Sequence, residues 1–192
     1  MPMLRKLITA ACVAALAACA SAPQRPPSPP QSAPAARPPA PDSVKVNAYE
    51  QKVMAATNAF RRDNSLVALE PDVRLIRIAQ AHAANMARQD KFGDTDKNGH
   101  VLDGRNVEYR IKTGGYEFGR IAENVGYQLN RPDPVAAMME GWKTSSGHRR
   151  NMLLHDVTEI GVGAAQGKSK RWYFVQLFGR PLSAPAAVKT SS

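Results

Sequence analysis

The chain has 192 residues, a formal net charge of +10, 43% hydrophobic residues and only two cysteines. This length suits one domain with tails, and two cysteines are too few for a disulfide scaffold or a cysteine-rich zinc module. The sequence holds no apolar run long enough to cross a bilayer. The fold must therefore rest on a hydrophobic core.

The N-terminal segment has the layout of a secretory signal. Arg5 and Lys6 precede an apolar stretch over residues 7–18, and charge followed by a short apolar segment is typical of an exported chain. The stretch ends in Leu-Ala-Ala-Cys19, which resembles the lipobox of bacterial lipoproteins, in which the cysteine becomes the lipidated N-terminus. We expect a signal peptide over residues 1–18 and acylation, as with palmitate, at Cys19. An ordinary signal with a chance cysteine is the alternative.

The segment after Cys19 predicts a tether. Ala20, rather than Asp, follows the cysteine, as in lipoproteins of the outer membrane. Residues 20–43 hold nine of the fifteen prolines, and proline-rich chains extend by about 3.1 Å per residue, or about 70 Å here. We expect residues 19–43 to anchor the domain to the outer membrane on its periplasmic side. A periplasmic or secreted protein is the alternative.

The charge of the chain favours anionic partners. Loss of residues 1–18 removes Arg5 and Lys6 and lowers the net charge from +10 to +8. We expect such a chain to be attracted to an anionic envelope polymer or to anionic lipid headgroups. A charge that serves only solubility is the alternative. No nucleic-acid partner is expected, because no basic motif is interleaved with aromatic residues.

Two helices are expected at the start of a domain that we place at residues 44–183. Apolar residues recur at helical spacing over 46–60, and again over 75–86 after Pro71 at a first-turn position. His82 lies on the apolar stripe of the second helix. A histidine in this position is more often a hydrogen-bonded core residue than a ligand.

Residues 92–127 are rich in glycine and are expected to form a long irregular loop, which is usually a functional feature. The stretch from Asp94 to Gly99 is superficially similar to the start of a calcium loop. An EF-hand is rejected because Arg105 stands at the twelfth position, where that loop needs glutamate.

The last part of the domain predicts two short helices and a hairpin. The helices are expected over 134–142 and from about 145 through 152, and the strands over 159–163 and 172–178. Helices followed by strands indicate an α+β fold rather than a doubly wound sheet. Residues 184–192 are small and polar and are expected to form a disordered tail.

Glu123 and His148 are the titratable residues in the most distinctive local contexts, AENVG and SSGHRRNML. The N-terminus of a helix favours the neutral form of His148, which can accept a proton or bind a metal. With Glu123 it could form an acid/base couple. The neighbouring Ser145 and Ser146 are expected to cap the helix rather than to act as nucleophiles. Trp142 and Trp172 could line a groove, although core packing is the favoured interpretation.

These strings, with TEIGVGAA and WYFVQLFG, resemble the CAP superfamily, also called the SCP or cysteine-rich secretory, antigen-5 and pathogenesis-related group. The resemblance covers nearly all of residues 46–180. It implies an α-β-α sandwich with a small central antiparallel sheet flanked by helices, and a cleft lined by histidine and glutamate. Glu123 matches the glutamate of the family's Gly-Glu-Asn motif, and His148 matches the histidine of its Gly-His-Arg motif.

The sequence departs from the family in two respects. The domain has no cysteine, which is common in bacterial members and opposite to the disulfide-bonded animal and plant ones, and one cleft histidine is missing. Bacterial members usually have a further cleft histidine in a Phe-Ser/Gly-His string, but this chain has Phe-Gly-Asp94. Either the carboxylate of Asp94 or the imidazole of His100 would have to take its place. The candidate cleft residues are therefore Asp94, His100, Glu123 and His148. The candidate ligands of a divalent metal such as zinc are His148, Glu123 and His100.

Three functions remain open on this basis. The favoured one is an envelope-tethered module that binds a lipid, glycan or peptide in the cleft. The second is a hydrolase of an envelope polymer, with His148 as base and Glu123 as acid, or with a bound metal that activates water. In the third, both residues only stabilise the fold through buried hydrogen bonds.

Overall fold

The computed structural model describes residues 43–95 and 98–182. The expected signal peptide, Cys19, the tether up to residue 42 and the tail at 184–192 lie outside the described residues. A compact unit runs from Pro39 to Ser192, and both apolar cores lie within it. Within the described part of the chain, no helix is both long and apolar enough to cross a membrane.

The described residues form five helices and four strands. In chain order these are α1 (Ala48–Asp63), β1 (Glu70–Pro71), α2 (Val73–Gln89), α3 (Val107–Thr113), β2 (Phe118–Gln128), α4 (Pro134–Thr144), α5 (Ser146–Met152), β3 (Glu159–Gln166) and β4 (Trp172–Pro181).

The strands form one sheet in the order β1-β3-β4-β2. Strands β2, β4 and β3 are antiparallel, as expected, but β1 pairs parallel to β3, so the sheet is mixed rather than purely antiparallel. The backbone N–H of Glu70 donates to Thr158 over 2.9 Å, and that of Asp72 donates to Ile160 over 3.0 Å. Pro71 therefore belongs to β1 and not, as expected, to the first turn of α2. The chain between β1 and β3 includes α2, and such a long connection is what parallel pairing requires.

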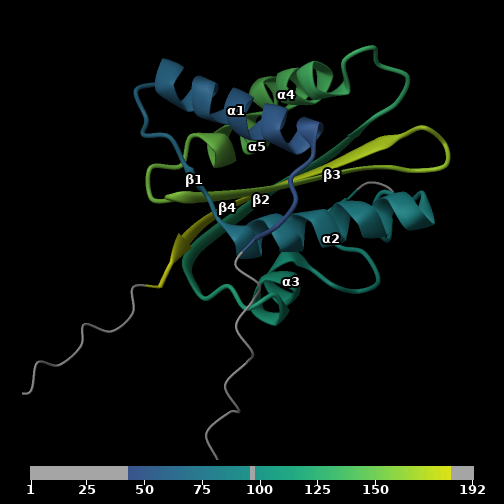
Figure 1. Cartoon of the computed structure of the whole chain (residues 1–192), viewed down its shortest axis with the longest axis horizontal. Coiled ribbons are helices and arrows are strands. Elements are labelled where there is room, and N and C mark those ends of the chain that lie inside the picture. Colours follow the sequence, from purple (N-terminus) through teal and green to yellow (C-terminus); the bar gives the residue numbers. More distant parts are fainter. Residues whose placement is uncertain (1–42, 96–97, 183–192) are drawn as a thin grey trace, which may run out of the picture. The chain divides into compact units, whose positions relative to one another are not determined.

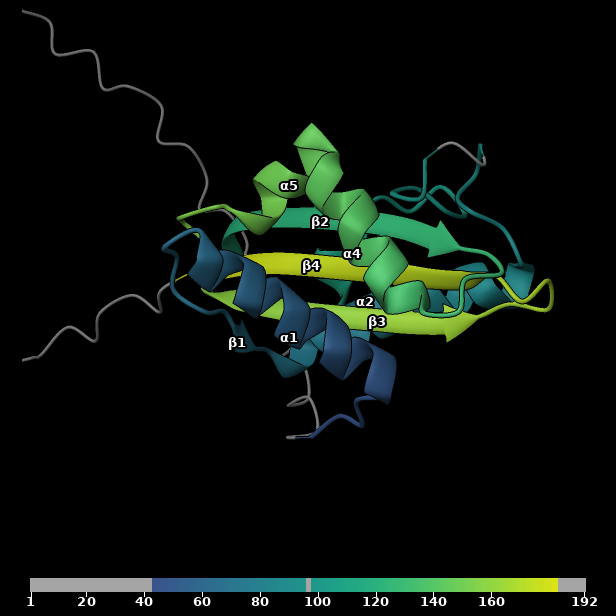
Figure 2. The ribbon, with the colours of Figure 1, turned by 90° about the horizontal axis from the view of Figure 1, so that it is seen from above.

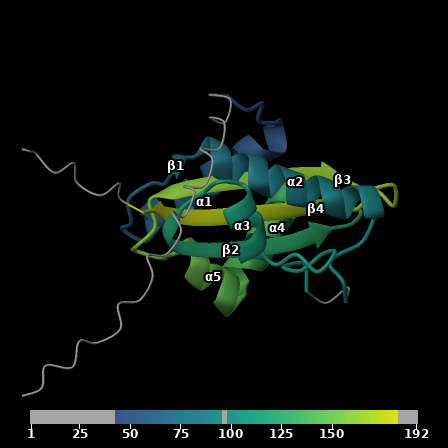
Figure 3. The same ribbon diagram turned by 90° about the horizontal axis from the view of Figure 1, so that it is seen from below.

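Helices cover both faces of the sheet, which confirms the α+β fold. Helices α1, α4 and α5 lie over one face (Figures 1 and 2), and α2 and α3 lie over the other (Figure 3). Side chains of a strand alternate between its faces. Along β4, Phe174 and Phe178 join the core under α1 and α4, whereas Tyr173, Val175 and Leu177 join the core under α2.

Local signals explain where the helices begin. Asn47 and Glu50 form a capping box at α1, and Asp72 caps α2. At α4, the N-cap Asp133 is followed by a proline. Ser145 is the N-cap of α5, but its side chain makes no cap hydrogen bond, so the expected capping by this hydroxyl is wrong.

The expectation of one irregular loop over 92–127 is wrong for its second half, which contains α3 and β2. Helix α3 has only seven residues, too few for a clear apolar period, and begins at the N-cap Asn106. Strand β2 contains Gly119 and Gly126, which weaken the strand signal. Its conformation comes from pairing with β4 along almost its whole length.

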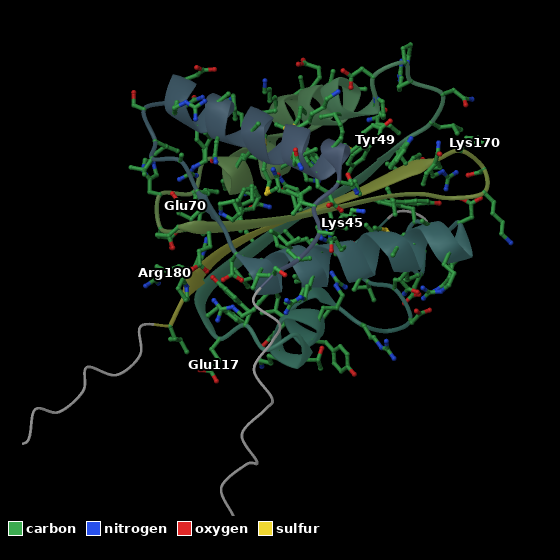
Figure 4. The ribbon with its side chains drawn as sticks, in the orientation of Figure 1. Lys45, Tyr49, Glu70, Glu117, Lys170 and Arg180 are labelled. Atoms are coloured by element: carbon green, nitrogen blue, oxygen red, sulfur yellow. The ribbon has the colours of Figure 1, made fainter. Side chains whose placement is uncertain are left out.

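Both tryptophans pack in the core beneath α1 and α4, as favoured. Trp142 is fully buried, and Trp172 is partly buried against the same cluster. The ring of Trp172 lies 4.2 Å from that of Tyr49. Figure 4 shows Tyr49 at the end of α1 that is nearer to the β3–β4 hairpin with Lys170, while Glu70 and Arg180 lie at the other end of the sheet.

Candidate functional site

Glu123 is a buried carboxylate on the edge strand β2. It lies opposite Leu177 of β4, and its side chain is 2% exposed. It shares a strand face with Val125, which belongs to the core under α2 and α3. A buried carboxylate is costly unless it is paired and hydrogen-bonded, so its partners define the site.

Both oxygens of Glu123 are engaged by side chains that carry N–H donors. Nη2 of Arg110 donates to Oε1 over 2.6 Å, and Nδ1 of His100 donates to Oε2 over 2.8 Å. Arg110 comes from α3, whereas His100 comes from the loop before it. Nη1 of Arg110 also donates to the carbonyl oxygens of His100 and Arg105, over 3.0 and 2.7 Å. Arg110 therefore fixes both the carboxylate and the loop.

His82 positions this loop from below. It is 3% exposed on α2, and its Nε2 donates to the carbonyl oxygen of Gly99 over 2.7 Å. Burial lowers the pKa of His82, and the positive charge of Arg110 lowers it further. His82 is thus the hydrogen-bonded core histidine that was favoured, and it holds the residue directly before His100.

His148 lies on the other side of β2, at the beginning of α5. No hydrogen bond or ion pair joins it to Glu123 within the described part of the chain, so the expected acid/base couple is not in direct contact. Burial lowers the pKa of His148, and electrostatic interaction with His100 lowers it further. His100 thus bonds to Glu123 and interacts electrostatically with His148.

A ladder of side-chain amides, buried at Asn124 and Gln176, fixes α5 against the sheet. Nδ2 of Asn124 donates to the carbonyl oxygen of His148 over 3.1 Å and to Oε1 of Gln176 over 2.9 Å. Nδ2 of Asn151 donates to the carbonyl oxygen of Glu123 over 3.1 Å and to Oδ1 of Asn124 over 3.0 Å. The strings AENVG, GHRRN and WYFVQ thus meet in one hydrogen-bond network.

The side chain of Asp94 bonds to the backbone of its own loop and not to Glu123. Its carboxylate accepts from the backbone N–H groups of Asp103 and Gly104, each over 2.9 Å. Of the two residues considered for the family's missing histidine, the structure brings His100 to Glu123 and places the Asp94 carboxylate on this turn. Arg110 was not among the predicted site residues. The one hint of its role in the sequence is indirect: a glutamate that is buried requires a positively charged partner.

The donor set does not fit a divalent metal. Among residues 43–95 and 98–182, no three His, Cys, Asp or Glu side chains come together as a metal site. Both oxygens of Glu123 already accept hydrogen bonds, and a metal there would lie beside the guanidinium of Arg110. Like charges this close repel one another, so Arg110 supplies the positive charge that the carboxylate requires.

The comparisons with known proteins agree on one family. The model of the CAP family, described as "Cysteine-rich secretory protein family", matches residues 54–178. Among curated proteins, the "Uncharacterized membrane protein YlbC" of Bacillus subtilis is 33% identical over 129 residues, which are 64% of this chain and 35% of that protein. The "Uncharacterized protein YkwD" of the same organism is 32% identical over 131 residues, 68% of this chain and 47% of that protein. The chain thus spans between a third and a half of the length of these relatives.

Solved structures show the same fold. An outer surface protein of Borrelia burgdorferi superimposes with a TM-score of 0.60 at 19% identity, over 72% of this chain and 97% of that one. An extracellular protein with an SCP domain from Bacillus anthracis gives a TM-score of 0.56 at 26% identity, over 72% of this chain and 45% of that one.

Proposed function

Because the chain belongs to the CAP family of cysteine-rich secretory proteins, we propose that it is an exported binding protein. It is tethered to the cell envelope by lipid at Cys19, and its cleft holds an anionic group of an envelope lipid or polymer. The lipobox-like string and the proline-rich segment support the anchor. Two similar proteins, one named as a membrane protein and one as an extracellular protein, support an envelope location.

The observation that carries this proposal is the double engagement of Glu123. Both oxygens of this buried carboxylate are hydrogen-bonded within the protein, one to Arg110 and the other to His100. The carboxylate orients the ring of His100, whose Nδ1 it occupies. The side chain of His100 is 42% exposed, and Nε2 is the nitrogen that Glu123 leaves for a ligand. A carboxylate or phosphate here would accept from Nε2–H of His100, which is present when both ring nitrogens carry a proton, and from a ring N–H of His148.

A hydrolase is the second candidate, with His148 as the base. One observation favours it, since the lowered pKa of His148 keeps the imidazole neutral and able to accept a proton near pH 7. Against it stands the lack of a hydrogen bond between His148 and Glu123 within the described residues, which leaves no oriented acid/base pair. Binding without turnover is therefore the better-supported function.

The test measures whether the protein binds to an envelope material and whether it also cleaves peptidoglycan. The unit from Pro39 to Ser192 is sedimented with purified peptidoglycan and, separately, with phosphatidylglycerol vesicles, and the peptidoglycan supernatant is assayed for released fragments. We expect retention on one of these materials without release of fragments, and loss of retention in His100→Ala and His148→Ala. His155→Ala, an exposed histidine after α5, is the control and should be retained as the parent protein is.

Two results would contradict the proposal. Release of soluble fragments that stops in His148→Ala would establish a hydrolase. Retention that is equal in the parent protein and both cleft variants would show that the cleft does not bind the material.

A further inference from the structure

A groove of about 620 Å³ lies on the opposite face of the domain from α5, between α2, α3 and the loop before α3. Glu123, His100 and His148 do not line it, although Arg110 and His82 do. Its size is within the range of sites for small organic ligands, about 300–1,000 Å³. The groove therefore needs its own explanation.

The charges that line the groove are mostly positive. They are four arginines, Arg77, Arg88, Arg105 and Arg110, against one carboxylate, Asp103. The carboxylate of Asp103 already accepts hydrogen bonds from the amides of Asn85 and Gln89. Within the described part of the chain, neither Arg88 nor Arg105 forms an ion pair with a carboxylate. Such a surface attracts anions.

The floor of the groove is apolar and combines small residues with larger aliphatic ones. Along α2, Ala81 and Ala84 lie between Arg77 and Arg88, which are about 16 Å apart at the helical rise. Ile78 and Leu102 are buried at the base, and the half-exposed ring of Tyr109 forms a wall. The guanidinium of Arg105 lies 5.8 Å from the centre of that ring. This combination suits a ligand with an apolar body and an anionic end.

We propose that the α2–α3 groove binds a small molecule that carries one phosphate or carboxylate on an apolar, ring-sized body. The body lies on Ala81, Ala84 and Leu102, and the anion pairs with Arg88 and Arg105. Arg110 lines the groove but stays paired with Glu123. The site goes beyond the proposed function of the cleft and depends on neither of its two ligand-facing histidines.

The test uses 1-naphthyl phosphate and 1-naphthoate as separate probes, titrated into the full chain and followed by amide NMR shifts. We expect saturable shifts confined to residues 77–88 and 102–114 with at least one of the two probes. The difference in affinity between the two probes shows whether the groove prefers a phosphate or a carboxylate. Arg105→Ala and Arg88→Ala should each weaken binding about tenfold, as loss of a charge-assisted hydrogen bond does. Arg150→Ala, an exposed arginine of α5 outside the groove, should leave the affinity unchanged.

Arg88 and Arg105 are exposed, so an unchanged melting temperature will show that the variants are folded. Neutral 1-naphthol bound as tightly as either anion would overturn the proposal. Inorganic phosphate bound as tightly as the naphthyl probes would indicate an adventitious ion only and would also overturn it. Shifts outside the groove, or none with either probe, would do the same. Binding that persists in His148→Ala separates this site from the cleft.

Discussion

Arg110 and Glu123 form an ion pair between α3 and β2, with Nη2 and Oε1 2.6 Å apart and both side chains largely buried, 11% and 2% exposed. The same guanidinium donates to the backbone of the loop that carries His100. The pair therefore does more than neutralise a buried charge. Together with the bond from His100 to Oε2, it fixes where the imidazole of His100 lies.

Removal of Arg110 should be strongly destabilising. Arg110→Met leaves the buried Glu123 carboxylate without its cation, and breaking a buried pair costs about 3 kcal/mol or more. We expect this loss of unfolding free energy in urea denaturation. The double variant Arg110→Met with Glu123→Gln should recover a large part of it, because no unpaired charge remains. If the two substitutions were simply additive, the pair would not be coupled as described.

Zinc should not bind in the cleft of the parent protein. The oxygens of Glu123 are occupied and a guanidinium lies beside them, so a divalent cation would have to displace His100 and approach Arg110. Isothermal titration of Zn²⁺ into the Pro39–Ser192 unit should show no stoichiometric binding that depends on the cleft. A one-to-one site that disappears in both His100→Ala and His148→Ala would show that the cleft rearranges to take the metal.

A side chain at Gly163, where β3 packs closely against α2, should destabilise the domain. A Cβ added at Gly163 would lie 2.2 Å from the carbonyl oxygen of Ala79, which is backbone and cannot move aside cheaply. We expect Gly163→Ala to lower the unfolding free energy by about 2 kcal/mol, the scale of overpacking in a core. Gly147→Ala in α5 is the matched control, because nothing lies within 4 Å of its added Cβ. Equal melting temperatures for the two variants would contradict this packing.

Several elements could be predicted because their signals are local. The apolar stripes over 46–60 and 75–86 predicted α1 and α2 to within about a turn. The alternation in 159–163 and the β-rich run in 172–178 predicted β3 and β4. Glu123 and His148 could be singled out because they lie in distinctive strings. Neighbouring residues of these strings form the amide ladder that joins β2 to α5.

The rest depends on contacts between distant parts of the chain. Strand β2 was missed because its glycines indicate a loop, and only the pairing with β4 makes it a strand. The role of Arg110 was missed because its carboxylate partner is thirteen residues away, on another element. The position of His100 depends on contacts that Arg110 of α3 and His82 of α2 make with its loop, and no local pattern predicts either contact.

The stability of the domain should fall as the pH is lowered from 7 toward 5. Burial lowers the pKa of both His82 and His148 in the folded state, so the unfolded chain binds more protons in this range. The contribution of such groups is present above the ordinary histidine pKa of about 6.5 and is lost as the pH falls toward the lower, folded value.

His82→Gln keeps an N–H donor for Gly99 but cannot titrate, and it should flatten the pH dependence measured by urea denaturation. His155→Gln, at an exposed histidine, should leave the slope unchanged. A slope that is the same in His82→Gln as in the parent protein would mean that the buried ring is not the titrating group.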